Sequence, residues 1–362
     1  MKQKNKKYRI TLGTFDLIKG LGMIIVIVGH MVSYYNINKL WPVYPVFAVA
    51  FLISSSIMPM FFMITGHGMK ARPCLEVLKK SISELLIPYF RVAGYIIVLF
   101  PLCHYACFRY LPGAMSEMLR YAVAFLLGIP KPGKMIFGMS SYWCSAVWFF
   151  LALFIAINVL NLILKIKNDN LRTVIVWLCL LGSFVCFYFD FNYFCLPQGL
   201  MATFFCYAGC ILKKYKMAEG ICGSPIFKRI TVIGILIVLL VQIFFGSMNL
   251  AYGTAINPLG CLAAIIGGTL CLCLSIKTNN LEGKLFEWIR KLGVYSYWII
   301  CIHTVEETCI PWYYWSEMNK DHQIFAFTVE LLIKFVLIVL VCTLLKKLSQ
   351  YKYAKRRASY EQ

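Results

Sequence analysis

Ten apolar runs of membrane-spanning length, separated by short polar or basic segments, decide what this chain can fold into. About twenty predominantly apolar residues span the hydrocarbon core of a bilayer as a helix. The chain has 362 residues, of which 60% are hydrophobic and 14% are charged. This composition excludes a soluble globular domain. We predict an all-α, polytopic membrane helical bundle with about ten transmembrane helices, at residues 15–35, 43–65, 85–103, 143–164, 173–189, 197–212, 230–245, 257–276, 292–310 and 325–345.

The basic residues predict the orientation of these spans. Most of the 36 Lys and Arg residues fall in the N-terminal segment, in every second loop and in the C-terminal tail. Because Lys and Arg accumulate in cytoplasmic loops, we expect both termini to be cytoplasmic, in a multi-pass protein of the plasma membrane. The formal net charge of +21 is then a topology signal, so membrane lipids and no nucleic acid are the expected partners. Residues 118–127 are too short to cross a bilayer and are predicted to form an interfacial or re-entrant helix.

Three ionisable side chains interrupt the first apolar run: Asp16, Lys19 and His30. Such groups are costly at membrane depth unless they face a cavity or a partner, so a functional role is the first hypothesis. On a helix, the spacing of Lys19 and His30 returns to within ~20° of the same face, ~16 Å further along the axis. Both can therefore point into one internal passage, and Asp16 can pair with Lys19. The alternatives are that Asp16 and Lys19 only anchor the helix end and that His30 is a packed histidine.

The ninth apolar run carries a second group of candidate residues. His303 is predicted to lie at mid-to-outer depth, as is His30, and Glu306 follows one turn later on the same helix face. This His–Glu pair can be catalytic or can be a buried structural pair, whereas Glu307 is predicted to face the outer interface. No metal is expected, because the spacing His-x-x-Glu is common and the sequence contains no His-x-x-x-His.

The first apolar run resembles the first helix of the acyltransferase-3 family in the pattern Asp-x-x-Lys-Gly-x-Gly, followed by an apolar run and Gly-His. Residues 60–66, 146–151 and 297–303 are similar to further blocks of that family. Most members carry Arg where Lys19 stands here, and an ammonium cannot form the two-pronged hydrogen bond of a guanidinium. The resemblance covers most of the chain. It implies a transmembrane domain at 1–350 and a basic cytoplasmic tail at 351–362.

The resemblance implies a membrane-bound O-acyltransferase, most commonly an O-acetyltransferase. The donor would be cytoplasmic acetyl-CoA, and the acceptor a hydroxyl of a cell-envelope glycan or of its lipid-linked precursor. Acyl transfer to a hydroxyl needs a base, and His30 is the candidate, with His303 and Glu306 completing the catalytic set. Lys19 and Arg91 are the candidates for binding the anionic donor, since a buried Arg needs an anion or several acceptors.

Two other functions fit the composition. A polytopic transporter or flippase also has many spans and intramembrane charges. A non-catalytic accessory subunit of polysaccharide synthesis is compatible with Lys19 at the usual Arg position. Substitution of His30 separates transport from acyl transfer, because only an acyltransferase would lose acetyl-CoA-dependent labelling.

Overall fold

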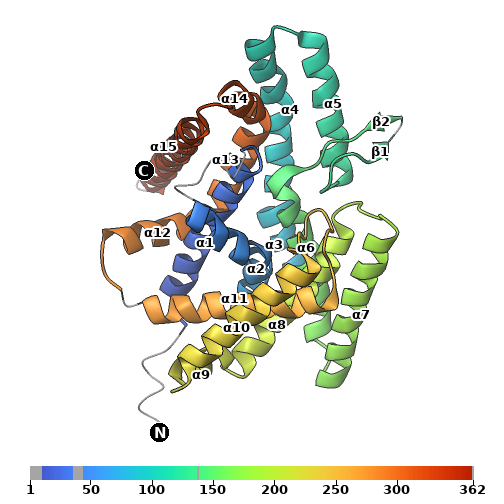
Figure 1. Cartoon of the computed structure of the whole chain (residues 1–362), viewed down its shortest axis with the longest axis vertical. Coiled ribbons are helices and arrows are strands. Elements are labelled where there is room, and N and C mark those ends of the chain that lie inside the picture. The colour runs from blue at the N-terminus through green and yellow to red at the C-terminus, as the bar shows by residue number, and fades with distance from the viewer. Residues whose placement is uncertain (1–9, 36–43, 137, 280, 361–362) are drawn as a thin grey trace.

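The computed structural model describes residues 10–35, 44–136, 138–279 and 281–360, which are almost entirely helical (Figure 1). The predicted all-α membrane bundle is therefore confirmed. The first half consists of α1 (Leu12–Val32), α2 (Tyr44–Gly68), α3 (Cys74–Ser81), a π-helical turn (Ile82–Leu86), α4 (Ile87–Phe108), α5 (Leu111–Leu127), the short antiparallel strands β1 (Met135–Ile136) and β2 (Met139–Ser140), a 3-10 turn (Ser145–Val147) and α6 (Trp148–Leu164). The second half consists of α7 (Asp169–Tyr188), α8 (Leu196–Lys214), α9 (Met217–Gly223), α10 (Phe227–Phe245), α11 (Pro258–Thr278), α12 (Lys284–Val294), α13 (Ser296–Cys309), α14 (Trp312–Met318) and α15 (Gln323–Tyr360).

In the described part of the chain, 7 helical stretches are long and apolar enough to cross a membrane. They correspond to the first, third, fourth, fifth, seventh, eighth and tenth predicted spans. Their bounds are Leu12–Val32, Cys74–Phe108, Ser145–Leu164, Asp169–Tyr188, Phe227–Phe245, Pro258–Thr278 and Gln323–Leu344.

The other three predicted spans are not among these stretches. The second corresponds to α2, and the sixth to α8, which packs among α2, α6 and α7. The ninth is not one continuous span, because the helix is interrupted at Tyr295. Before the break, α12 is amphipathic and packs Ile289, Leu292 and Gly293 inward, mainly against α1. After it, α13 has 14 residues, too few to cross a bilayer alone.

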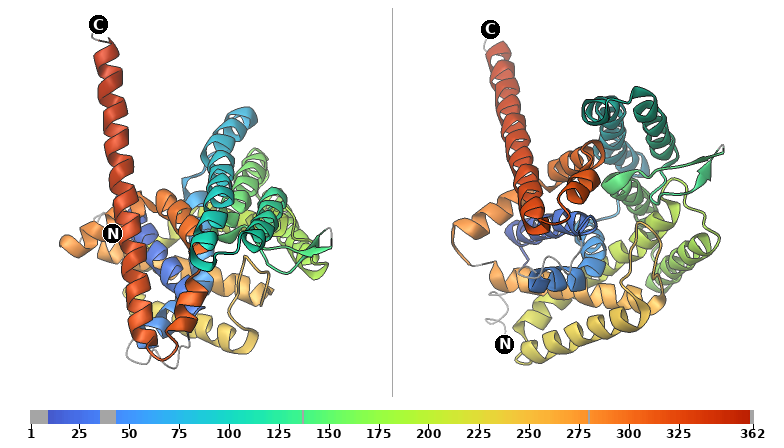
Figure 2. Two further views of the ribbon diagram at one scale, coloured as in Figure 1. Left: turned by 90° about the horizontal axis from the view of Figure 1, so that it is seen from above. Right: turned by 45° about the horizontal axis from the view of Figure 1, so that its top comes forward.

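Two helices are longer than predicted. The expected short helix at 118–127 is the end of α5, which has 17 residues and lies antiparallel beside α4 (Figure 1). The Tyr89 hydroxyl of α4 donates a hydrogen bond to the Phe125 carbonyl of α5 at 2.7 Å. At the C-terminus, α15 has 38 residues and extends far beyond the rest of the bundle (Figure 2). The predicted tail, 351–362, therefore continues this helix as far as Tyr360.

Glycines permit the closest helix crossings. A methyl group added at Gly20 of α1 would overlap the Ile289 carbonyl of α12, and one at Gly293 would overlap the Asp16 carbonyl of α1. Small residues let helix backbones approach in membranes, where van der Waals packing drives helix association. The crossing of α1 and α12 fixes the start of α1, which carries Asp16 and Lys19.

Candidate active site

The end of α1 and the middle of α13 bring the two predicted histidines into contact. Nδ1 of His30 lies 3.2 Å from Nε2 of His303, although the residues are 273 positions apart in the sequence. The ring centroids are 5.0 Å apart, and His303 is fully buried. The two side chains, which were predicted to lie at a similar depth, are therefore in direct contact.

Glu306 holds His303 in place from one turn further along α13. Its Oε1 lies 2.7 Å from His303 Nδ1, as the spacing predicted. The indole Nε1–H of Trp312, on α14, donates to the other oxygen of Glu306 at 2.7 Å. With 6% of its surface exposed, Glu306 is a buried carboxylate whose two oxygens are both used.

A buried lysine from α15 completes the site. The Lys334 ammonium lies 2.9 and 3.0 Å from the two oxygens of Glu306 and also pairs with Glu307. It lies 3.3 Å from Oε1 of Glu330, although that oxygen has no aligned hydrogen-bond donor. Lys334 is fully buried, so these carboxylates replace its water. Sequence reasoning assigned no role to Lys334 or Glu330.

Two tyrosines after the end of α1 bind the remaining carboxylates. Tyr34 donates to Glu307 at 2.5 Å, and Tyr35 donates to Glu330 at 2.7 Å. The prediction that Glu307 faces the outer interface is wrong, because its side chain is only 8% exposed and points to Lys334. The pairing with Lys334, on a helix that is distant in sequence, turns Glu307 inward.

These contacts assign protons within the histidine pair. Both oxygens of Glu306 already accept hydrogen bonds, from Lys334 and from Trp312, so His303 Nδ1 is the donor in the hydrogen bond between His303 and Glu306. In neutral His303, Nε2 then has the lone pair, and His30 Nδ1 must donate to it. The remaining nitrogen of His30, Nε2, therefore has a lone pair, and no hydrogen bond from the described residues reaches it.

Carboxylates next to the histidines can offset part of the cost of a cation that forms there. Three carboxylates, on Glu306, Glu307 and Glu330, surround a single ammonium, that of Lys334. With neutral imidazoles the cluster has an excess of negative charge in a poorly solvated place. Fixed charges of this kind stabilise an imidazolium that forms beside them.

The side chains of His303, Glu306 and Glu307 are close enough together to hold a metal ion. The Lys334 ammonium already contacts both carboxylates, so a metal ion would have to displace this cation and leave it buried. His303 is in addition hydrogen-bonded through both ring nitrogens. The donor set fits a lysine-centred ion cluster better than a metal site.

The family model of the acyltransferase domain matches residues 12–347, nearly the whole chain. The chain belongs to the acyltransferase-3 family. No curated protein and no solved structure gives a significant match. As an acyltransferase-3 protein with several membrane-spanning helices, it is a membrane acyltransferase. The matched region contains every residue of the polar cluster, from His30 to Lys334.

The two predicted donor-binding residues of this acyltransferase lie apart from the cluster. Lys19 pairs with Asp16 at 2.9 Å, as predicted, and its side chain is 29% exposed. Arg91 was expected to be buried, but it lies on the exposed face of α4 because Tyr89 and Val92 take the inward positions. It is near enough to the Tyr297 hydroxyl of α13 to interact with it electrostatically.

Proposed function

We propose that this protein is an O-acetyltransferase that moves an acetyl group from cytoplasmic acetyl-CoA to a hydroxyl of a cell-envelope glycan or of its lipid-linked precursor. The observation that carries the proposal is the chain of hydrogen bonds Glu306–His303–His30, which leaves a lone pair on His30 Nε2. Acyl transfer to a hydroxyl needs a base of this kind.

In the proposed reaction, His30 Nε2 takes the proton of the acceptor hydroxyl as its oxygen attacks the thioester carbonyl carbon. A carbon–oxygen bond forms and the carbon–sulfur bond breaks. The proton on His30 then passes to the departing thiolate, so the products are the ester and free CoA. The imidazolium present between these steps donates its Nδ1–H to His303, and Glu306 and Glu307 supply the nearby negative charge.

His303 has a positioning role in this proposal. Both of its ring nitrogens already have partners, so neither is free to contact the acceptor or the oxyanion. It holds His30 in the tautomer that a base requires, and Glu306 and Lys334 hold His303. Lys19 and Arg91 remain proposed contacts of the anionic donor, with Lys19 beside its pantetheine arm.

Labelling with radioactive acetyl-CoA and an envelope extract tests the proposal. His30→Ala should lose transfer by about 10²–10⁴-fold, the range that general-base catalysis supplies. His322→Ala is the matched control, since His322 is an exposed histidine outside the cluster. Normal labelling in His30→Ala would exclude His30 as the base, and no labelling by the wild-type protein would favour a transporter or an accessory subunit.

A further inference from the structure

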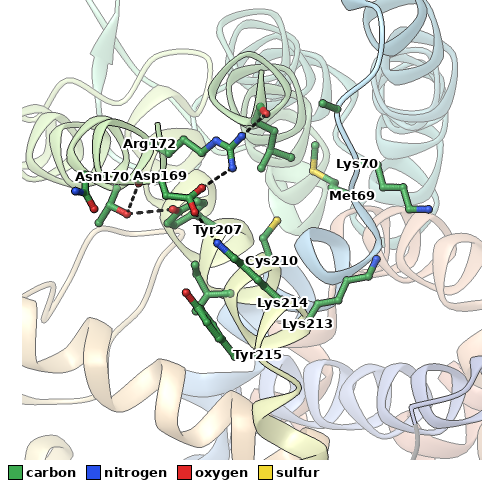
Figure 3. Close-up of a pocket in the computed structure, with 14 residues that line it drawn as sticks. Met69, Lys70, Asp169, Asn170, Arg172, Tyr207, Cys210, Lys213, Lys214 and Tyr215 are labelled. Carbon is green, nitrogen blue, oxygen red and sulfur yellow. Dashed lines mark hydrogen bonds and ion pairs between the residues drawn. The ribbon is translucent and has the colours of Figure 1, made fainter. Parts of the chain in front are cut away.

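A basic cavity lies where four chain segments begin or end (Figure 3). It is formed by the turn after α2, the end of α6, the first turn of α7 and the end of α8. All four segments belong to the side that the distribution of Lys and Arg predicts to be cytoplasmic. The volume is about 520 Å³, within the range of small-molecule sites.

The lining of the cavity contains more cationic than anionic side chains. Lys70, Arg172, Lys213 and Lys214 line it, with Asp169 as the lining carboxylate. Asp169 is already shared, because Lys214 lies 2.6 Å and Arg172 lies 2.8 Å from its two oxygens. Figure 3 shows this ion cluster on one wall of the cavity.

The other two lysines are available to a ligand. Lys70 and Lys213 are exposed, and neither makes an ion pair with the residues that the structure describes. In Figure 3 their ammonium groups point away from Asp169. Two such ammonium groups in one cavity form a site for an anion with more than one negative charge.

An aromatic ring lies beside these cations. Tyr215 lines the cavity with 63% of its surface exposed, and the Lys214 ammonium lies 5.5 Å from its ring centroid. Nucleotide bases stack on exposed aromatic rings. Phosphate-binding lysines next to an exposed tyrosine therefore suit a nucleotide.

His67 links the wall of the cavity to the start of α1. His67, in the last turn of α2, packs its ring 5.2 Å from that of Phe15 and is close enough to Lys213 to interact with its charge. Phe15 directly precedes Asp16, the partner of Lys19. His67 therefore lies between the cavity and the helix that carries Lys19 and, ~16 Å further along its axis, His30.

We propose that this cavity binds the phosphates of a nucleotide, with Lys70 and Lys213 as the phosphate contacts and Tyr215 as the stacking surface for the base. The assignment rests on the proposed function, because the nucleotide is then the adenosine end of the acyl-CoA donor. The acyl-bearing arm of the donor extends along α1 past Lys19 toward His30. An anionic lipid headgroup shares the phosphate chemistry and is distinguished by the experiment below.

Binding of 3′-phosphoadenosine 5′-phosphate to the full chain in phosphatidylcholine nanodiscs tests this site. The double variant Lys70→Gln/Lys213→Gln should bind this nucleotide about tenfold more weakly, since each exposed charge contact contributes up to ~1 kcal/mol. Tyr215→Ala should weaken binding by at least about fivefold through the lost stacking. Lys284→Gln, at an exposed lysine of α12 outside the cavity, should bind as the wild type does.

Three outcomes would overturn the assignment. One is equal affinity of the wild type and the double lysine variant, and another is no nucleotide binding by the wild type. The third is loss of nucleotide binding in phosphatidylglycerol nanodiscs, which would assign the cavity to lipid headgroups. Because binding is measured without acyl transfer, an active enzyme with unchanged nucleotide affinity in the lysine variant would refute this site alone. Nucleotide binding without acyl transfer would refute the proposed function alone.

Discussion

At the scale of single residues, the site depends on one cation shared among several carboxylates. Lys334 contacts Glu306, Glu307 and Glu330, and each carboxylate has a further donor: His303 and Trp312 for Glu306, and one tyrosine for each of the others. A buried ion pair contributes little net stability compared with apolar packing, but loss of one partner leaves an uncompensated charge. The cluster is therefore sensitive to the removal of Lys334.

Lys334→Met should destabilise the protein by about 3–5 kcal/mol, because it leaves three buried carboxylates without their shared cation. The measurement is thermal unfolding in detergent. Lys284→Met, which removes an exposed lysine from α12, is the control and should unfold at nearly the wild-type temperature. If the two variants unfolded at the same temperature, the carboxylates would be neutral or solvated in the native protein.

Glu306→Gln should lower kcat by at least about tenfold, a loss of ~1.4 kcal/mol of transition-state stabilisation. The amide is nearly isosteric, but it lacks the charge that stabilises an imidazolium at the histidine pair. An interaction made only in the transition state changes kcat and leaves KM in place, so the ratio of the two changes is the test. Glu306→Asp, which keeps the charge, should retain more activity than Glu306→Gln, and the reverse order would contradict the positioning role.

Part of this cluster was predictable from local sequence. Asp16 with Lys19, and His303 with Glu306, are neighbours on one helix turn, so spacing alone placed each pair. The contacts of Lys334 join α13 to α15 and depend on tertiary packing, which spacing does not encode. A signal was present nonetheless: Lys334 interrupts an apolar run with Glu330 four residues before it, and such a pair rarely occurs in a span without a role.

At the scale of helices, the close crossing of α1 and α12 positions the start of α1. Gly20 and Gly293 each face a carbonyl group of the other helix. Sequence periodicity predicted one continuous span at 292–310, because apolar residues lie on both sides of Tyr295. The helix before that residue packs on α1, an interaction that a hydropathy pattern cannot reveal.

Gly293→Ala should lower the unfolding temperature, because the added methyl group overlaps the Asp16 carbonyl. Overpacking of this kind typically costs about 1–3 kcal/mol. The displaced turn carries the pair of Asp16 with Lys19, so donor affinity should fall as well. Gly29→Ala is the matched control on α1, since its methyl group would meet nothing within 4 Å. Equal stability of the two variants would show that the crossing of α1 and α12 can accommodate the added methyl group.

At the scale of the whole molecule, aromatic contacts join segments that the distribution of Lys and Arg places on the same side of the membrane. Phe15 and His67, both on the predicted inner side, have ring centroids 5.2 Å apart. Phe108 and Tyr314, both on the predicted outer side, have ring centroids 4.7 Å apart. Helix packing groups these segments in the same two sets as the charge bias, and the charge bias alone predicts which set is cytoplasmic. The order of the spans was therefore accessible from sequence, whereas the shape of the α4–α5 hairpin and of the interrupted ninth segment was not.

The predicted sidedness can be measured directly with reporter fusions. Fusions after Lys216 and after Lys284 should report the cytoplasm, because these segments carry the basic residues that resist translocation. Fusions near Lys131 and Asn319 should report the outside. The proposed reaction needs this arrangement, since the basic cavity and Lys19 must face the cytoplasmic donor while the histidine pair lies toward the acceptor.

A cytoplasmic signal at Lys131 would mean that α5 crosses the membrane. Every later segment would then have the opposite orientation, and the residues that line the basic cavity would lie on two different sides of the membrane. The contacts among its four walls forbid that, so such a result would contradict the bundle as well as the topology.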